Sequence, residues 1–168
     1  MIVHMDETIR PARPDEADTI LEIINAAAQR YKGAIPDDCW HEPYMSAGDL
    51  GEQMARGVVF SVVERDGEVV GVMGLQAVDD ADLIRHAYVR PSAQGQGLGG
   101  RLLEHFKALS KPKLLIGTWA AATWAIGFYE AHGFALAPGE RAQQLLKRYW
   151  RIPARQAEVS VVLERLRG

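Results

Sequence analysis

The feature that most constrains the fold is a strand, a glycine-rich loop and a helix that follow one another in mid-chain. The strand ADLIRHAYV ends at Arg90-Pro91, and the loop QGQGLGG comes next. A strand that passes through glycines into a helix leaves several backbone N–H groups unpaired, and the helix dipole favours negative charge there. The sequence therefore predicts an anion site over residues 94–100, ahead of a helix whose apolar face carries Leu98, Leu102, Phe106 and Leu109.

The local charge and the position of this loop narrow its ligand. From Arg85 to Lys113 there are six Lys or Arg residues against one acidic residue, within a chain of net charge -3. A diphosphate suits such a site. The glycines also fit the dinucleotide fingerprint G-x-G-x-x-G, but the motif lies past mid-chain and no acidic residue follows at about 20 positions. No Gly-Lys-Ser/Thr ends the loop, which argues against a P-loop. A tight turn beside a solvated basic helix is the structural alternative.

The other elements predict a mixed sheet covered by helices. Two apolar runs, VVFSVVE and EVVGVMGLQ, meet at Asp66-Gly67, a strong hairpin signal. We expect further strands at residues 7–10, KLLIGTW, FALA and VSVVL, and helices at residues 15–31, 46–56, TWAIGFYEAHG and RAQQLLKRYW. Antiparallel hairpins beside a β-loop-α-β crossover make the sheet mixed, and near-continuous apolar strands require helices on both faces. The predicted class is α/β (α+β type), a three-layer α/β/α fold.

Length and composition place the chain among ordinary globular proteins. Its 168 residues, 48% of them hydrophobic, predict a single domain over residues 1–168. The slightly acidic balance argues against a general nucleic-acid or anionic-membrane binder. The lone Cys39 allows no internal disulfide, and we expect no metal site because Cys and His residues lack ligand spacing. The N-terminus lacks a secretory-signal pattern and no apolar run is long enough to span a membrane, so we expect a cytoplasmic protein.

Two motifs carry a resemblance to a known family. QGQGLG, at residues 94–99, resembles the Q/R-x-x-G-x-G/A signature of the GNAT superfamily of N-acetyltransferases. About 30 residues later, AIGFYEAHGF resembles the second motif of that family, a helix that ends in F-Y-E-x-x-G-F. Two motifs at the usual separation are more specific than either alone, and the element order matches over nearly the whole chain. The wording elsewhere is most similar to a bacterial GNAT group of unassigned acceptor.

The resemblance implies an acyl-CoA N-acyltransferase fold whose fourth and fifth strands splay apart, with acetyl-CoA (coenzyme A) as the cofactor. The loop would bind the diphosphate, and the backbone near Tyr88 would pair with the pantetheine arm and polarise the thioester. Many members carry Asn where this chain has Ala122, so that contact with the arm is missing here. The expected cofactor-binding residues are Ala87, Tyr88, Val89, Gln94, Gly95, Gln96, Gly97, Leu98, Gly99, Gly100, Arg101, Ala122, Ala125, Phe128 and His132.

The implied reaction is direct attack of an amine on the thioester, which needs a proton donor for the thiolate and a base for the ammonium. By resemblance, Tyr129 is the general acid; periodicity alone would make it a core aromatic. His86 titrates in the right range for the base, although a histidine on an apolar strand is also a common structural residue. Cys39 as an acyl-carrying nucleophile is a further alternative that the family chemistry does not need.

By resemblance, the loop with Asp37, Asp38, His41 and Glu42 lines the acceptor side, and each of these four residues is an alternative base, acting directly or through water. This loop lies in the segment 37–52. That segment holds five acidic residues and no Lys or Arg, and a hairpin at Asp79, Asp80 and Asp82 adds three more. With its aromatic residues, this segment suits a small or cationic primary amine, or a peptide amine; a solvated acidic surface is the alternative. The expected acceptor-binding residues are Asp37, Asp38, Trp40, His41, Glu42 and Trp119.

Other function classes stay open at this point. A non-catalytic acyl-CoA-binding or regulatory module would keep the loop without cleaving thioesters, and the replacement at Ala122 is compatible with it. A dinucleotide-dependent oxidoreductase would bind a nicotinamide cofactor instead. By resemblance, a homodimer is possible. The sequence identifies neither the acceptor nor the acyl chain that is transferred.

Overall fold

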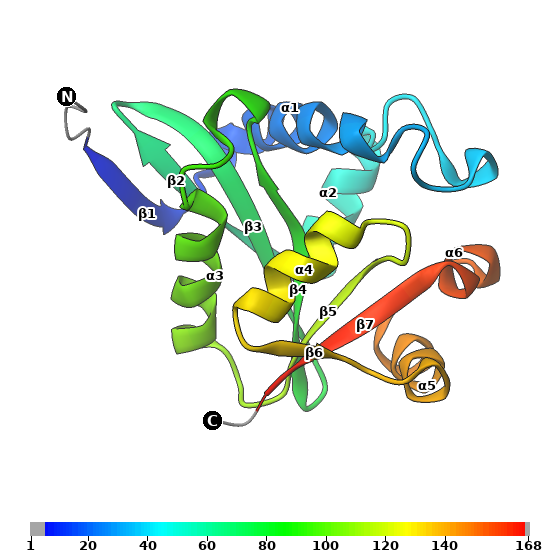
Figure 1. Cartoon of the computed structure of the whole chain (residues 1–168). Coiled ribbons are helices and arrows are strands. Elements are labelled where there is room, and N and C mark those ends of the chain that lie inside the picture. The colour runs from blue at the N-terminus through cyan, green and yellow to red at the C-terminus, as the bar shows by residue number, and fades with distance from the viewer. Residues whose placement is uncertain (1–5, 167–168) are drawn as a thin grey trace.

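A computed structural model describes residues 6–166 (Figure 1). Thirteen helices and strands follow the predicted order closely, and their bounds fix the positions used below. The strands are β1 (Glu7–Pro11), β2 (Val58–Arg65), β3 (Glu68–Val78), β4 (Ala81–Val89), β5 (Leu114–Trp119), β6 (Phe134–Leu136) and β7 (Ser160–Arg165). The helices are α1 (Ala17–Ala28), α2 (Ala47–Ala55), α3 (Leu98–Leu109), α4 (Thr123–Ala131), α5 (Gly139–Tyr149) and α6 (Ala154–Glu158).

The strands form one mixed sheet in the order β1-β2-β3-β4-β5-β7-β6. Only β4 and β5 are parallel; every other neighbouring pair is antiparallel. Helix α3 supplies the crossover between the parallel strands, as a parallel pair requires. The predicted mixed sheet is therefore confirmed.

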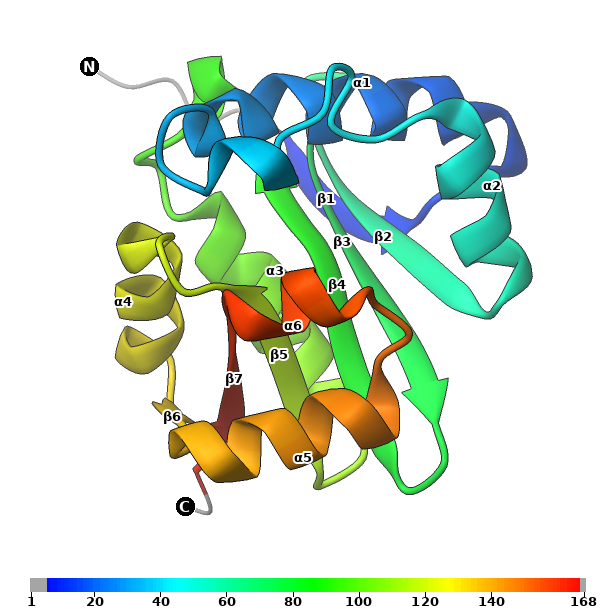
Figure 2. The ribbon, with the colours of Figure 1, turned by 90° about the vertical axis from the view of Figure 1, so that its right-hand side faces the viewer.

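Helices cover both faces of this sheet (Figures 1 and 2). Leu102 of α3 and Tyr129 of α4 pack with Ile84 of β4 on one face. On the other face α1 packs over β2 and β3, and α5 packs over β5 and β7. Neighbouring residues of one strand go to opposite cores, as Leu83 and Ile84 do. This alternation confirms the three-layer arrangement and explains why the strands read as continuous apolar runs.

Local sequence explains the turns and helix starts. The β2–β3 hairpin turns at Asp66 and Gly67, which have φ values of 51° and 81°, the left-handed pair that a two-residue turn needs. The side chain of Ser46 accepts a hydrogen bond from the backbone N–H of Asp49 and so caps α2. Helix α4 ends before Gly133, whose φ is 88°.

Three details of the prediction were wrong. The first helix is shorter than expected, because 3-10 turns flank Ala17–Ala28 on both sides. On α3 the buried stripe uses Leu103, whereas Leu109 is the last residue of the helix and is 67% exposed. Helix α6 was not expected; with five residues it is too short to show a helical period, and Pro153 before it is the only start signal.

The pairing of β4 with β5 is short, and this positions the site. Only Asp82, Leu83 and Ile84 pair with β5, at Leu114–Ile116. Beyond Ile84 the two strands part, as the resemblance implied. Strand β4 also bulges against β3: Val72 pairs with Tyr88 and Gly74 with Arg85, which leaves two residues of β4 opposite one of β3.

The bulge is centred on His86, whose φ of 56° lies in the left-handed region. A regular strand would send consecutive side chains to opposite faces. Here Arg85 and His86 instead line the same two cavities.

In the described part of the chain, none of the helices has the length and apolarity required to cross a bilayer.

Candidate functional site

The loop between β4 and α3 presents a row of free amides. Across residues 6–166, the N–H groups from Gly95 to Gly100 donate no hydrogen bond, and the first helical bond of α3 runs from Arg101 N–H to the carbonyl of Gly97 at 3.1 Å. Gly95 and Gly97 both have φ of 79°, which turns the chain sharply into the helix. Six unpaired amides at the positive end of a twelve-residue helix form an anion site.

Two arginines flank this loop. Arg65, at the end of β2, contacts the side chain of Gln96, and it also pairs with Glu7 of β1 at 2.9 Å. Arg101 pairs with the same Glu7. One carboxylate therefore holds two guanidinium groups beside the free amides. Sequence reasoning expected Arg101 and missed Arg65, because the hairpin that carries Arg65 lies far from the motif in sequence.

Helix α4 closes one side of a groove over the loop. A Cβ atom at Gly100 would lie 2.8 Å from Nε2 of His132, so only glycine lets α3 approach this ring. Nδ1 of His132 lies 2.8 Å from the carbonyl oxygen of Phe128, which fixes the ring. The groove holds about 840 Å³ and is lined by Gly95, Gly97, Gly99, Gly100, Arg101, Phe128 and His132 among others.

The groove continues into a cavity of about 290 Å³ where β4 and β5 part, here called the splay cavity. Val89, Gln94, Gly99 and Phe128 line both spaces. The splay cavity in turn adjoins a smaller connecting cavity of about 110 Å³ on the side of the sheet that carries α5. The residues that line both are Tyr31, Ile84, His86, Tyr88, Gly117 and Thr118. A row of adjoining cavities therefore runs from the free amides to the other face of the sheet.

The main chain of β4 is open along this row of cavities. Arg90 N–H donates to the carbonyl of Val70 at 2.8 Å, so the alternation of an antiparallel ladder turns the main-chain groups of Val89 toward the side that β5 leaves open. The Val89 carbonyl accepts a bond from the side chain of Gln94 at 3.2 Å. By the same alternation the main-chain groups of Tyr88 face β3, and its ring packs with Tyr31, at 6.3 Å between centroids.

Tyr129 lies on the wall of the splay cavity. Its ring is 7% exposed and makes edge contacts with Phe128 and Phe134, at centroid distances of 5.2 and 6.1 Å. Its hydroxyl donates to no residue of the described chain, and burial raises the pKa of the phenol. A protonated hydroxyl that makes no hydrogen bond and lies beside a cavity can donate its proton to a group bound there.

His86 lies where three cavities meet. Its Nε2 contacts Oε1 of Gln53, an acceptor, so this nitrogen carries the proton and Nδ1 keeps its lone pair. The ring stacks on Phe60 at 6.2 Å between centroids. Burial, with a smaller contribution from the charge of Arg85, lowers the pKa of His86 to about 3. The imidazole is therefore neutral at physiological pH, a hydrogen-bond acceptor and a weak base.

The low pKa of His86 makes stability depend on pH. The unfolded chain protonates this residue near pH 6.5, whereas the folded chain does so only near pH 3. Its contribution to the free energy of unfolding is complete above pH 6.5 and is lost as the pH falls toward 3. We expect the free energy to fall by about 2 kcal/mol between pH 6.5 and 4.5 from this residue. Urea unfolding of His86→Gln should lose most of that slope, and the exposed control His41→Gln should keep it; equal slopes would contradict the shift.

A cavity of about 350 Å³ lies beyond the connecting cavity and is here called the far cavity. Segments distant in sequence build it: the stretch before α2, helix α2 itself, β4, and residues 151–156 around the start of α6. Asp38 joins two of these segments through a two-point ion pair with Arg155, at 2.8 and 3.2 Å. Trp119 donates to the hydroxyl of Tyr44 at 2.9 Å and lines both the far cavity and the connecting cavity.

The comparisons with known proteins agree with this geometry. The sequence model of the acetyltransferase (GNAT) domain matches residues 56–136, which run from the end of α2 to β6 and include the loop, the splay and Tyr129. Over this segment, just under half of the chain, the sequence is similar to a GNAT acetyltransferase domain. GNAT acetyltransferases use acetyl-CoA, so the free amides of the loop stand where this family needs an anion site.

Solved structures share the GNAT fold over nearly the whole chain. PaiA N-acetyltransferase of Thermoplasma acidophilum, in complex with coenzyme A, has a TM-score of 0.72 and 16% identity, over 97% of this chain and 100% of that one. The ribosomal-protein-S18-alanine N-acetyltransferase of Escherichia coli has a TM-score of 0.67 and 19% identity, over 97% and 96%. N-acetylglutamate synthase of Neisseria gonorrhoeae, with coenzyme A and N-acetyl-glutamate, has a TM-score of 0.63 and 21% identity, over 99% of this chain and 36% of that one.

The GNAT fold brings most of the expected cofactor residues to this row of cavities, with two exceptions. Ala122 is fully buried between Trp119 and α4, away from the splay cavity, so it offers no contact there. Gln96 contacts Arg65 instead of lining the groove. The splay cavity also has polar residues that no GNAT motif indicated. They are Arg30, which lies 4.3 Å from the ring centre of Trp124, and Thr118.

The expected acceptor residues divide into two groups. Asp38, His41 and Trp119 line the far cavity, as does the buried thiol of Cys39. The other three, Asp37, Trp40 and Glu42, do not line it.

The acidic surface expected around the acceptor is largely neutralised. Glu42 pairs with Lys32 at 3.6 Å, Glu52 with Arg56 at 2.5 Å, and Asp38 with Arg155. Pairing therefore neutralises most of the negative charge that favoured a cationic acceptor.

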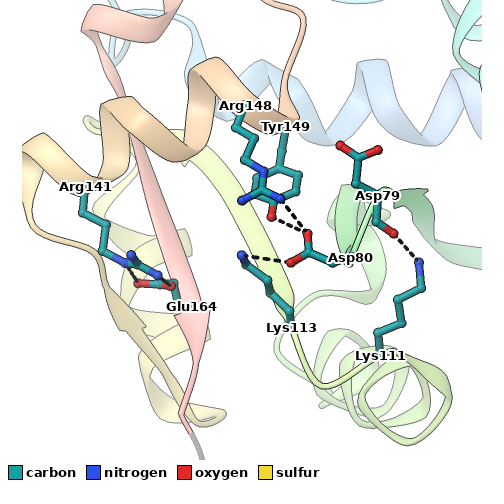
Figure 3. Close-up of polar contacts among 8 residues, drawn as sticks. All are labelled: Asp79, Asp80, Lys111, Lys113, Arg141, Arg148, Tyr149 and Glu164. Atoms are coloured by element: carbon teal, nitrogen blue, oxygen red, sulfur yellow. Dashed lines mark hydrogen bonds and ion pairs between the residues drawn. The ribbon is translucent and has the colours of Figure 1, made fainter.

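The acidic hairpin between β3 and β4 has a structural role (Figure 3). Asp80 accepts the hydroxyl of Tyr149 at 2.5 Å and pairs with Lys113 and Arg148, each at 3.5 Å. These bonds tie the turn to α5 and to the start of β5, at the end of β4 opposite the splay. Buried Asp82 accepts the backbone N–H of Lys111 at 2.7 Å. None of the three aspartates of this hairpin lines the far cavity, so they do not face an acceptor there.

Proposed function

We propose that the chain is an N-acetyltransferase that transfers the acetyl group of acetyl-CoA to a primary amine, on a small molecule or a peptide, by direct attack. The observation that carries this proposal is that the free amides of residues 95–100 line a groove that adjoins the splay cavity beside Tyr129. A purely regulatory module would need the amides but not a second opening on the other side of the sheet. The proposal treats residues 1–168 as one domain.

The residues present fit coenzyme A. The diphosphate would lie on the amides of residues 95–100, with Arg65 and Arg101 adding positive charge beside them. The glycines leave room there, since a Cβ atom at Gly95 or Gly97 would meet nothing within 4 Å. The open main chain of β4 at Val89 would pair with the amides of the pantetheine arm, as an added strand would. When bound, acetyl-CoA supplies the acetyl group as an activated thioester.

The chain's own groups would then divide the remaining tasks. Main-chain N–H groups of β4 at the splay polarise the thioester carbonyl. Nδ1 of His86 accepts a hydrogen bond from the amine and orients its lone pair. Because the pKa of His86 is about 3, the amine arrives already deprotonated or loses its proton to solvent. The hydroxyl of Tyr129 would protonate the leaving thiolate, and the proton that the attacking nitrogen releases on forming the amide would return to the tyrosinate through solvent.

Coenzyme binding and thiol release test this function directly. We expect acetyl-CoA to raise the melting temperature by several degrees, because roughly a hundredfold excess over Kd adds about 2.7 kcal/mol to the free energy of unfolding. Free thiol should appear when an accepted amine is added from a panel of amino acids, peptides, polyamines and aminoglycosides. Binding without thiol release for any amine would favour the non-catalytic module. A calorimetric titration that is flat at millimolar coenzyme A would end the proposal.

A further inference from the structure

An arginine-rich cavity adjoins the far cavity at the foot of α2. It holds about 320 Å³ and is lined by residues of α2, β3, β4 and the α5–α6 connection. Three of its lining residues are arginines, Arg56, Arg85 and Arg151, and within residues 6–166 no carboxylate lines it. All three arginines also line the far cavity, so the two cavities adjoin.

The charges of these arginines are not equally satisfied. Arg56 pairs with Glu52 on the surface. Arg85 donates only to the neutral side-chain oxygen of Gln76, at 3.0 Å, and forms no ion pair with any described residue. The structure pairs Arg151 with no carboxylate either, as far as residues 6–166 extend. Burial and the nearby charge of Arg56 lower the pKa of Arg85.

A partly buried guanidinium without a counter-charge is costly unless an anion joins it. Its planar fork matches a carboxylate, which it can bind through two parallel hydrogen bonds. The bulge of β4 adds the decisive geometry. Arg85 and His86 are consecutive and line the same cavities. A small molecule whose anionic group binds Arg85 would therefore be long enough to reach His86 and the splay.

We propose that the acceptor is a primary amine that also carries a carboxylate, with the carboxylate on Arg85 and the amine directed toward His86 and the splay. Arg151 and Arg56 add to the positive field that attracts it. This inference rests on the proposed function and names its substrate class. It replaces the cationic acceptor that the acidic segment suggested, since the carboxylates of that segment are mostly paired.

Equilibrium binding to the complex of the protein with coenzyme A tests this inference without requiring turnover. Calorimetry would compare matched pairs of amines: L-phenylalanine with 2-phenylethylamine, L-lysine with cadaverine, and β-alanine with ethylamine. We expect the carboxylate-bearing member of at least one pair to bind about tenfold more tightly or better than its partner. Phosphoethanolamine against ethanolamine reports whether the site prefers a phosphate instead.

Variants localise the preference. Arg85→Gln should remove the difference within each pair, and Arg85→Lys should keep part of it, because a point charge remains without the fork. Arg148→Gln is the matched control: it removes the same charge from an exposed residue that pairs with Asp80 outside both cavities (Figure 3).

The possible outcomes separate the two proposals. Equal binding within every pair, no binding by any carboxylate, or tighter binding of phosphoethanolamine than of every carboxylate would overturn the carboxylate assignment. A preference that survives Arg85→Gln would overturn the role of that residue. Thiol release with an amine that lacks a carboxylate, alongside equal binding, would leave the acetyltransferase intact and remove only this inference. A preference in binding with no thiol release from any amine would keep the carboxylate site and remove the acetyltransferase.

Discussion

Replacing Tyr129 with phenylalanine is expected to lower kcat about a hundredfold while changing the Kd for coenzyme A less than about twofold. The substitution removes one oxygen from a ring that the side chains of Phe128 and Phe134 continue to hold. No described residue hydrogen-bonds to that oxygen, so no partner is left unsatisfied and the fold should be unaffected. What disappears is the proton for the departing thiolate.

Steady-state kinetics with a saturating amine, together with calorimetry on the same variant, checks this prediction. An unchanged melting temperature is the control that separates lost chemistry from lost folding. A kcat within about threefold of the parent value would mean that water or another group supplies the proton, and Tyr129 would return to being a core aromatic.

Introducing a negative charge at Gly95 should weaken coenzyme A binding about ten- to one-hundredfold. Gly95 has φ of 79°, and a Cβ atom there would meet nothing within 4 Å, so a small polar side chain fits. Asp and Asn both tolerate this backbone conformation better than other residues do. Gly95→Asn is therefore a control with the same shape and the same strain but no charge.

The difference in Kd between Gly95→Asp and Gly95→Asn reports the electrostatics of the loop alone. It should shrink as salt is raised, because the site is open to solvent. Equal affinities of the two variants at low salt would show that the diphosphate lies elsewhere.

The geometry of the glycine-rich loop could be predicted from the sequence because it depends on local chemistry. Two short motifs determine the free amides, the glycines with left-handed φ and the close approach of α3 to His132. The mixed sheet followed from the β-loop-α-β crossover and from two hairpins, one of which turns at the local pair Asp66-Gly67.

The acceptor side was harder because long-range contacts decide it. The stretch 37–52 looks acidic in sequence, but Lys32, Arg56 and Arg155 neutralise it, and Arg155 is 117 positions from its partner Asp38. The side chains of Arg85 and His86 come together only because the bulge cancels the alternation of β4. A pattern of period two would have placed them on opposite faces of the sheet.

The link between Asp38 and Arg155 has a consequence for how such a protein can diverge. It fastens two surface segments, one before α2 and one at α6, that form much of the far cavity while contributing nothing to the glycine loop or its groove. Insertions or substitutions in these two segments could change the acceptor without changing the residues proposed to bind coenzyme A. Under the proposed function, the acceptor range can change independently of coenzyme binding, which makes these segments the targets for engineering new selectivity.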